Sequence, residues 1–225
     1  MNTVLKRSRA DVLKGIEASG VVAVIRLRDP NLLQGVVEAL MEGGVRALEV
    51  TMTVPRAVEL IAQLAPKLSP EFLLGAGTVL DAATTRQVID AGARFVVSPV
   101  FKREVIDACR QRDVVVAPGC FTPTEILTAW EAGADVVKVF PATALGPGYF
   151  KDVLAPLPHV RLMPTGGVTK ENAGDWIAAG AVALGVGSAL VDAKAVAEKR
   201  FVAIAENARH FVAAVQQARA QRART

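Results

Sequence analysis

The sequence predicts an α/β fold, a (β/α)8 TIM barrel with an extra N-terminal helix, in which residues 1–225 form one domain. Eight short apolar runs, rich in β-branched residues, follow one another along the chain. A helical stretch separates each run from the next, so the run ends recur every 20 to 27 residues, the spacing of a strand plus one crossover helix. No linker interrupts the series. The predicted strands are 21–26, 47–51, 73–78, 95–99, 114–119, 136–141, 161–166 and 183–188.

The segments between these runs have the pattern of amphipathic helices. Residues 31–42 place their apolar side chains on one face, and residues 10–19 are expected to form the extra helix over the bottom of the barrel. Thr122 or Thr124 is expected to cap the helix after the fifth strand, with Pro123 in its first turn. A basic amphipathic helix at about 194–216 is expected to close the barrel or to contact another subunit.

An open, doubly wound sheet is the alternative arrangement of alternating strands and helices. Such sheets usually have fewer strands, and their dinucleotide-binding form carries G-x-G-x-x-G after the first strand. The first predicted strand is followed here by RLRDPN, which lacks that motif. The count of eight units therefore favours the barrel.

The composition is that of a globular protein with a large core, because 52% of the residues are hydrophobic and 21% are charged. No apolar run approaches the length of a membrane span, and the basic N-terminus lacks a signal-peptide core. A cytoplasmic protein without a membrane partner is expected. Cys109, Cys120, His159 and His210 are too few and too dispersed for a His/Cys metal site, which leaves only an oxygen-ligated magnesium open.

The chain is mildly basic, with a net charge of +4, which suits an anionic partner. Much of the excess charge lies in the tail QQARAQRART, which is expected to be a solvated, fraying end. A nucleic-acid-binding arm is the alternative interpretation of this tail. We expect no nucleic-acid partner.

In a (β/α)8 barrel, the active site lies at the C-terminal ends of the strands. The predicted strands present polar side chains at this end, and Lys138 is the most unusual of them because it lies inside the apolar run VVKVFP. Lysine is costly to bury without a partner. Either this strand has one face in water, or Lys138 is buried so that it can act as a neutral amine. The other candidates at this end include Arg26, Glu49, Thr51, Thr53, Thr78, Ser98, Pro99 and Thr165.

Glu49 is the natural partner of Lys138. Successive strand residues point to opposite faces, so the two side chains can meet only if both point into the barrel. Burial disfavours the charged form of the lysine, and a neutral amine can attack a ketone to form a Schiff base while a nearby carboxylate moves protons. The alternative is a buried ion pair that only stabilises the barrel, although desolvation makes such pairs weak stabilisers.

The last two predicted strands are followed by glycine-rich loops. TGGV follows the seventh strand with Gly166 and Gly167, and GVGSAL follows the eighth with Gly187 and Ser188. Small residues let backbone N–H groups approach an anion, and these two loops often bind phosphate in this fold. Tight turns that need a positive φ are the alternative reason for glycine there.

These motifs together resemble the 2-keto-3-deoxy-6-phosphogluconate aldolases, a family that includes the 2-keto-3-deoxy-6-phosphogalactonate and 4-hydroxy-2-oxoglutarate aldolases. The resemblance runs in order from about Val21 to Val191. Its motifs are LEVTMTVP, GAGTVLD, FVVSP, PGCFTPTE, VVKVFP, MPTGGV and GVGSALV.

The resemblance implies a class I lyase on a (β/α)8 barrel that needs no metal or other cofactor and is usually a trimer. Lys138 would form the Schiff base, Glu49 would be the general acid/base, and the glycine-rich loops would hold phosphate. The other residues matched to substrate binding are Arg26, Thr51, Thr53, Thr78, Pro99, Phe140 and Thr165. The implied reaction cleaves 2-keto-3-deoxy-6-phosphogluconate to pyruvate and D-glyceraldehyde 3-phosphate, in sugar-acid breakdown of the Entner–Doudoroff type.

One position departs from a pattern found in part of the family. Some members carry an arginine two residues after the threonine of E-V-T, where it can hold the substrate carboxylate, and this chain has Thr53. Arg26 can hold either the carboxylate or a more distant group. The galactonate epimer and 4-hydroxy-2-oxoglutarate are alternative substrates. An isomerase or synthase barrel and a non-catalytic phosphosugar-binding protein are the alternatives from other classes.

Overall fold

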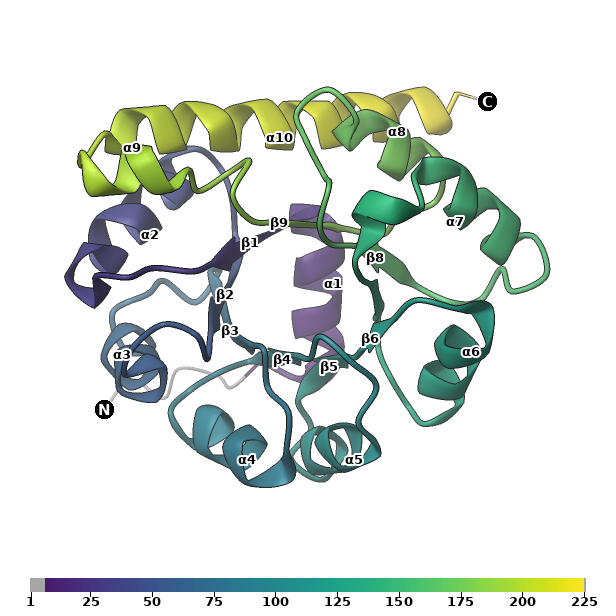
Figure 1. Cartoon of the computed structure of the whole chain (residues 1–225), viewed down its shortest axis with the longest axis horizontal. Coiled ribbons are helices and arrows are strands. Elements are labelled where there is room, and N and C mark those ends of the chain that lie inside the picture. Colours follow the sequence, from purple (N-terminus) through teal and green to yellow (C-terminus); the bar gives the residue numbers. More distant parts are fainter. Residues whose placement is uncertain (1–6, 225) are drawn as a thin grey trace.

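The computed structural model describes residues 7–224, so the first six residues and Thr225 lie outside the described part. The chain has an α/β fold in which parallel strands curve around a centre and helices cover their outer side (Figure 1). The parallel α/β class predicted from the sequence is therefore confirmed. The strands are β1 (Val21–Ile25), β2 (Ala47–Thr51), β3 (Leu73–Gly77), β4 (Phe95–Val97), β5 (Val115–Ala117), β6 (Gly119–Cys120), β7 (Val137–Val139), β8 (Leu162–Pro164) and β9 (Leu184–Val186).

The strands form two sheets, in the orders β5-β4-β3-β2-β1-β9 and β6-β7-β8. Predicted strand 114–119 is split into β5 and β6 because Pro118 has no N–H with which to continue the ladder. The Pro118 carbonyl still accepts a hydrogen bond from the Lys138 N–H at 2.9 Å. A parallel bridge between Thr165 and Gly185 joins the other edges of the two sheets.

The helices alternate with the strands, as the pattern predicts. The predicted capping threonine is Thr122, which forms a capping box with Glu125. Predicted helix 31–42 begins with a 3-10 turn, η1 (Pro30–Leu32), and the C-terminal helical stretch consists of two helices instead of one. The other elements are α1 (Arg9–Ser19), α2 (Leu33–Glu42), α3 (Ala57–Leu64), α4 (Ala82–Asp90), α5 (Arg103–Gln111), α6 (Pro123–Glu131), η2 (Ala142–Ala144), α7 (Pro147–Leu154), α8 (Ala173–Ala178), α9 (Ala193–Ala197) and α10 (Phe201–Arg222).

Two apolar clusters pack against the strands, one on their inner face and one on their outer face. The inner cluster joins Val12 and Ile16 of α1 to side chains near the starts of the strands, such as Ala47, Leu73 and Val136. The larger outer cluster fills the space between the strands and the surrounding helices. The helix α1 therefore packs across the N-terminal ends of the strands, where residues 10–19 were predicted to lie (Figure 1).

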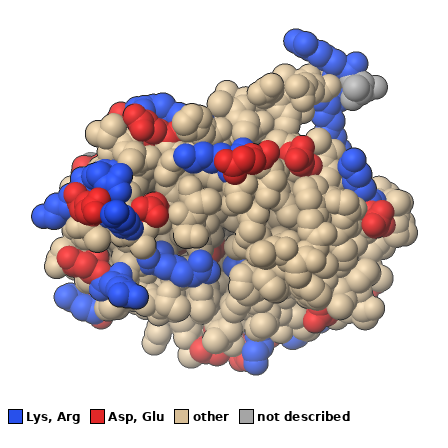
Figure 2. Space-filling model, turned by 45° about the horizontal axis from the view of Figure 1, so that its top comes forward, with Lys and Arg blue, Asp and Glu red and all other residues tan. Residues whose placement is uncertain are grey.

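The basic C-terminal segment is helical as far as Arg222, so the prediction of a fraying tail is wrong for most of its length. The Arg219 guanidinium donates hydrogen bonds to the carbonyls of Ala18, Glu17 and Val182, which fixes the end of α10 against α1 and β9. Acidic and basic side chains are mixed on the face shown in Figure 2, while basic side chains gather at the end of α10. None of the helices in residues 7–224 is long and apolar enough to cross a membrane.

Candidate active site

Lys138 is buried on the inner side of the curved strands, with 3% of its surface exposed. It lies two residues after Val136, a member of the inner cluster, and alternation along β7 therefore points Lys138 to the inner side as well. The hydrogen bond from its N–H to Pro118 fixes the backbone at this point. Its Nζ lies 5.1 Å from the centre of the Phe140 ring. The interpretation of β7 as a strand with one face in water is wrong.

Glu49 points to the same interior from β2. It lies two residues after the inner-cluster residue Ala47, and only 1% of its surface is exposed. Neither carboxylate oxygen has a hydrogen-bond partner among the described residues. A buried carboxylate without a partner is costly, so Glu49 is available to exchange a proton or a hydrogen bond with a bound molecule.

The protonation of this pair follows from its burial. Desolvation raises the pKa of Glu49, and the nearby positive charges of Lys138 and Arg26 oppose this shift. Desolvation also lowers the pKa of Lys138, an effect that Glu49 opposes and Arg26 reinforces. Both shifts favour the neutral forms, whereas a stabilising ion pair would favour the charged ones. With no direct ion pair between the two side chains, the purely structural interpretation of Lys138 and Glu49 is disfavoured.

Arg26 lies near this pair, and two threonines stand at and just beyond the end of β2. Arg26 follows β1, and its Nη1 packs so close to Gly187 that a Cβ at that glycine would lie 3.3 Å away. The hydroxyl of the buried Thr51 donates to the Ile25 carbonyl at 2.9 Å and lies 2.6 Å from the hydroxyl of Thr53. Thr53 is exposed at this end of the strands, whereas Thr51 is buried.

The glycine-rich loops lie at the ends of β8 and β9. Gly166 and Gly167 have φ angles of 86° and 73°, so the turn itself needs glycine there. In the described part of the chain, the N–H groups of Gly166, Gly167 and Ser188 donate to no acceptor. Glycine can therefore serve both the tight turn and the binding of an anion, because the turn leaves several backbone N–H donors available.

Thr165 lies between the end of β8 and the glycine-rich loop that follows it. Its side chain is 3% exposed and its hydroxyl has no hydrogen-bond partner among the described residues. Like Glu49, it is therefore a buried polar group that can hydrogen-bond to a bound molecule at the same end of the strands.

Three other predicted residues stand at the strand ends. Thr78, just after β3, has a φ of 59°, which is unusual for a β-branched residue and costs about 1–3 kcal/mol. Pro99 is half-buried after β4, and its carbonyl packs against Gly119. Phe140 lies beyond the end of β7, beside the Lys138 amine. The strands β7 and β8 end earlier than predicted, at Val139 and Pro164, and Phe140 and Thr165 therefore lie on loops.

Sequence reasoning missed two glycines that shape the interior. A Cβ at Gly77 would lie 2.6 Å from Glu49 Oε1, and one at Gly185 would lie 2.2 Å from Thr165 Oγ1. Both occur in G-x-G runs at inward positions, so strand alternation could have identified them. Because Gly77 and Gly185 have no side chain, there is room for the carboxylate of Glu49 and the hydroxyl of Thr165.

The cysteines and histidines are not part of this constellation. Burial raises the pKa of both Cys109 and Cys120 to about 12, so neither is a ready thiolate. His159 packs against Trp130, away from Lys138. The described residues contain no group of three or more His, Cys, Asp or Glu that could hold a metal ion.

Comparison with known proteins agrees with this arrangement. Residues 12–206 match the family model described as KDPG and KHG aldolase. A 2-dehydro-3-deoxy-phosphogluconate aldolase of Treponema pallidum is 37% identical over 84% of this chain and 90% of its own length. A 2-dehydro-3-deoxy-6-phosphogalactonate aldolase of Escherichia coli is 35% identical over 88% of this chain and 95% of its own length.

A solved structure extends the comparison to the fold. The KDPG aldolase of Legionella pneumophila, with pyruvate captured as a covalent carbinolamine intermediate, is 30% identical with a TM-score of 0.82. The alignment covers 88% of this chain and 96% of that one. The resemblance seen in the sequence motifs is confirmed: the chain belongs to the KDPG and KHG aldolase family.

Proposed function

We propose that this aldolase cleaves 2-keto-3-deoxy-6-phosphogluconate to pyruvate and D-glyceraldehyde 3-phosphate through a Schiff base on Lys138. The observation that carries the proposal is the pairing of a buried amine, whose pKa is lowered, with the buried and unpartnered carboxylate of Glu49. Both lie on the inner side of the strands, and no side chain in residues 7–224 hydrogen-bonds to the carboxylate. A buried lysine of this kind is a suitable nucleophile for a ketone.

The first half of the reaction builds an electron sink. The neutral amine of Lys138 attacks the C2 carbonyl carbon, and the carbonyl oxygen takes a proton to give a carbinolamine. Glu49 transfers the protons that allow this hydroxyl to leave as water. The product is an iminium ion at C2, which can accept electrons from the neighbouring C3–C4 bond.

The second half breaks the carbon skeleton. Glu49, directly or through a water, removes the proton of the C4 hydroxyl, and the C3–C4 electrons move into the iminium to give an enamine. D-Glyceraldehyde 3-phosphate leaves as the aldehyde. The enamine is protonated at C3, and water hydrolyses the resulting iminium to release pyruvate and restore the Lys138 amine. The apolar neighbours of the amine keep it poorly solvated throughout.

The loops after β8 and β9 are proposed to hold the phosphate. The free N–H groups of Gly166, Gly167 and Ser188 support this role, and Gly187 brings the backbone beside Arg26. The residues proposed to contact the remainder of the substrate are Thr51, Thr53, Thr78, Pro99, Phe140 and Thr165. Arg26 is proposed to hold either the carboxylate or a more distant group.

We also propose that the chain works as one closed (β/α)8 domain in the cytoplasm, in Entner–Doudoroff sugar-acid breakdown. The hydrogen bonds that join the edges of the two sheets support closure. A homotrimer is proposed from the family resemblance. Three exposed apolar side chains support it, since Leu80, Val100 and Phe121 follow successive strands at the same end of the fold.

The same chemistry suits the galactonate epimer and 4-hydroxy-2-oxoglutarate, and the Escherichia coli relative acts on the former by its name. Pyruvate release from each of the three compounds, coupled to NADH oxidation by lactate dehydrogenase, separates them. We expect kcat/KM to be highest for the gluconate compound, by about tenfold. A preference for another compound would change the substrate but keep the chemistry, whereas no release from any of them would refute the proposal.

A further inference from the structure

Two threonine hydroxyls at the end of β2 form a short hydrogen-bonded chain in which each hydrogen has only one place. The Thr51 hydroxyl lies 2.9 Å from the Ile25 carbonyl oxygen and 2.6 Å from the Thr53 hydroxyl. A carbonyl oxygen can only accept, so Thr51 uses its single hydrogen on Ile25. The hydrogen between the two hydroxyls therefore belongs to Thr53, which donates to Thr51.

The direction of this chain decides what Thr53 offers to a bound molecule. A hydroxyl has one hydrogen to donate and two lone pairs that accept, and the hydrogen of Thr53 is used on Thr51. If Thr53 turned that hydrogen away, two oxygens would face each other at 2.6 Å with no hydrogen between them. The exposed Thr53 hydroxyl is thus an acceptor. It suits a hydroxyl group of a ligand and does not suit a carboxylate, which also only accepts.

The backbone on both sides of Thr53 holds its hydroxyl beside Thr51. In the turn that follows β2, the N–H of the buried Val54 donates to the Thr51 carbonyl at 2.9 Å. The Met52 N–H donates to the Gly77 carbonyl at 2.8 Å, which ties the turn to β3 as well. Because both neighbours of Thr53 in the chain are fixed, the acceptor is presented at a defined position.

The strand order places Thr53 on the same part of the rim as the proposed phosphate loop. Thr51 lies two residues after Glu49 on β2, so both side chains point to the inner face and Thr51 is nearer to the strand end. Beside β2 lie β1 and then β9, with Arg26 following β1 and Gly187 following β9. A substrate that reacts at Glu49 and holds its phosphate at the loop after β9 therefore leaves the interior along this rim.

We propose that Thr53 selects substrates that carry a hydroxyl on C5, the carbon between the aldol carbon C4 and the phosphorylated C6. The inference rests on the proposed function, in which the C4 hydroxyl gives its proton to Glu49 and the C5 hydroxyl is the next donor toward the phosphate. Thr53 accepts a hydrogen bond from that hydroxyl. In 4-hydroxy-2-oxoglutarate, C5 is a carboxylate, whose oxygens would face the lone pairs of Thr53.

Cleavage of 2-keto-3-deoxy-6-phosphogluconate and of its 5-deoxy analogue tests this role. We expect the wild-type kcat/KM to be about threefold to tenfold higher for the compound with the hydroxyl, the effect of one hydrogen bond between uncharged groups. Thr53→Val keeps the size of the side chain but has no oxygen, so it should lose this preference, whereas Thr53→Ser should keep it. Thr128→Val, at an exposed position in α6, is the matched control and should keep it too.

A second variant tests the direction of the hydrogen bond. Thr51→Val removes the acceptor that holds the hydrogen of Thr53, so Thr53 becomes able to donate to a ligand. We expect kcat/KM for 4-hydroxy-2-oxoglutarate, relative to that for the phosphogluconate compound, to rise by about threefold. A ratio that stays the same or falls would contradict the assigned direction.

Reductive trapping with pyruvate separates this inference from the proposed function. Pyruvate has a carboxylate and no hydroxyl, so Thr53→Val should reach half-maximal trapping at the same pyruvate concentration as the wild type. A higher concentration would show that Thr53 holds the carboxylate and would overturn the inference. So would a wild type that does not prefer the C5 hydroxyl, or a Thr53→Val variant that still does. A wild type that traps no pyruvate would instead refute the proposed function on which the inference rests.

Discussion

Glu49 and Lys138 lie on different strands, point into the same interior, and are both shifted by burial toward their neutral forms. Glu49 has no hydrogen-bond partner among the described residues. Of the two cations that lower the pKa of its carboxyl group, Lys138 has the larger effect and Arg26 the smaller. A buried carboxylate without hydrogen bonds beside a buried amine does not stabilise a fold, because the cost of desolvation offsets the attraction between the charges. This arrangement suits a proton carrier beside an amine that must be neutral to react.

Glu49→Gln should separate proton transfer from amine attack. Because glutamine keeps the size of the side chain but cannot carry a proton, we expect kcat to fall by about 10²–10⁴ while Lys138 still reacts with pyruvate. Steady-state cleavage and reductive trapping measure the two steps separately. Glu59→Gln, an exposed position in α3, is the control and should retain wild-type values. Full activity of Glu49→Gln would remove Glu49 from the mechanism.

The pH dependence of amine attack should follow the charges around Lys138. Its pKa is lowered, so trapping with pyruvate and cyanoborohydride should rise with pH through a midpoint below 10.5. Glu49 raises this pKa, so the midpoint should move to lower pH in Glu49→Gln. Arg26 lowers it, so the midpoint should move to higher pH in Arg26→Gln. Shifts in the opposite directions would contradict the electrostatic account.

Arg26 is expected to bind substrate as well as to influence the pair. Removing its guanidinium in Arg26→Ala should raise KM or lower kcat, because the side chain lies beside Gly187 at the proposed phosphate loop. Arg28→Ala is the matched control, since Arg28 is exposed two residues further along the chain. Unchanged kinetics in Arg26→Ala would place Arg26 outside the site.

The contact between α2 and α10 offers a test of the fold that leaves the site untouched. A Cβ at Gly43 would lie 2.3 Å from the Ala208 Cβ and 2.6 Å from the Ala205 carbonyl oxygen. Gly43→Ala should therefore lower the free energy of unfolding by about 1–3 kcal/mol. Gly148→Ala in α7 meets nothing within 4 Å and should be neutral or slightly stabilising. Chemical denaturation of both variants measures the difference, and equal stabilities would show that α10 packs differently.

Much of this arrangement could be predicted because it depends on local patterns. Strand alternation relates Lys138 to Val136 and Glu49 to Ala47, and a parallel sheet brings the strand ends together. The glycine-rich loops could be recognised for the same reason, since their position follows from the order of the strands.

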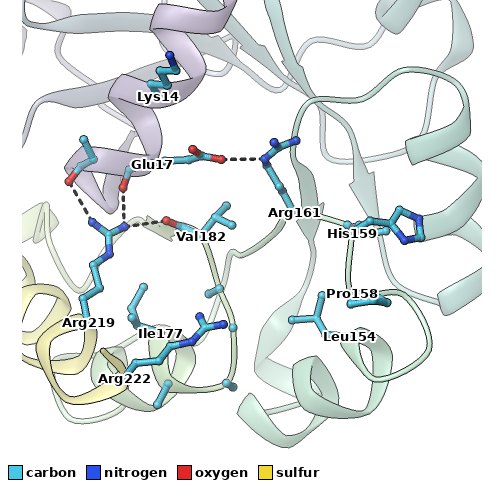
Figure 3. Close-up of a pocket in the computed structure, with 16 residues that line it drawn as sticks. Lys14, Glu17, Leu154, Pro158, His159, Arg161, Ile177, Val182, Arg219 and Arg222 are labelled. Atoms are coloured by element: carbon cyan, nitrogen blue, oxygen red, sulfur yellow. Dashed lines mark hydrogen bonds and ion pairs between the residues drawn. The ribbon is translucent and has the colours of Figure 1, made fainter. Parts of the chain in front are cut away.

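The features that sequence reasoning missed depend on contacts between distant segments. The three carbonyls that hold Arg219 belong to α1 and to the segment before β9 (Figure 3), so the tail looked like a solvated end. The left-handed conformation of Thr78 has no signal in its own residue type. Strand alternation could have identified Gly77 and Gly185 as inward positions, but their close approach to Glu49 and Thr165 is a contact between different strands.

The central claim is that Lys138 forms a covalent imine with pyruvate. Intact mass spectrometry after incubation with pyruvate and borohydride, followed by peptide mapping, tests it directly, with Lys138→Met as the control. We expect one reduced pyruvate adduct per chain, on Lys138, and none on the variant. A folded wild-type protein that forms no adduct, or forms it equally in Lys138→Met, would contradict the account.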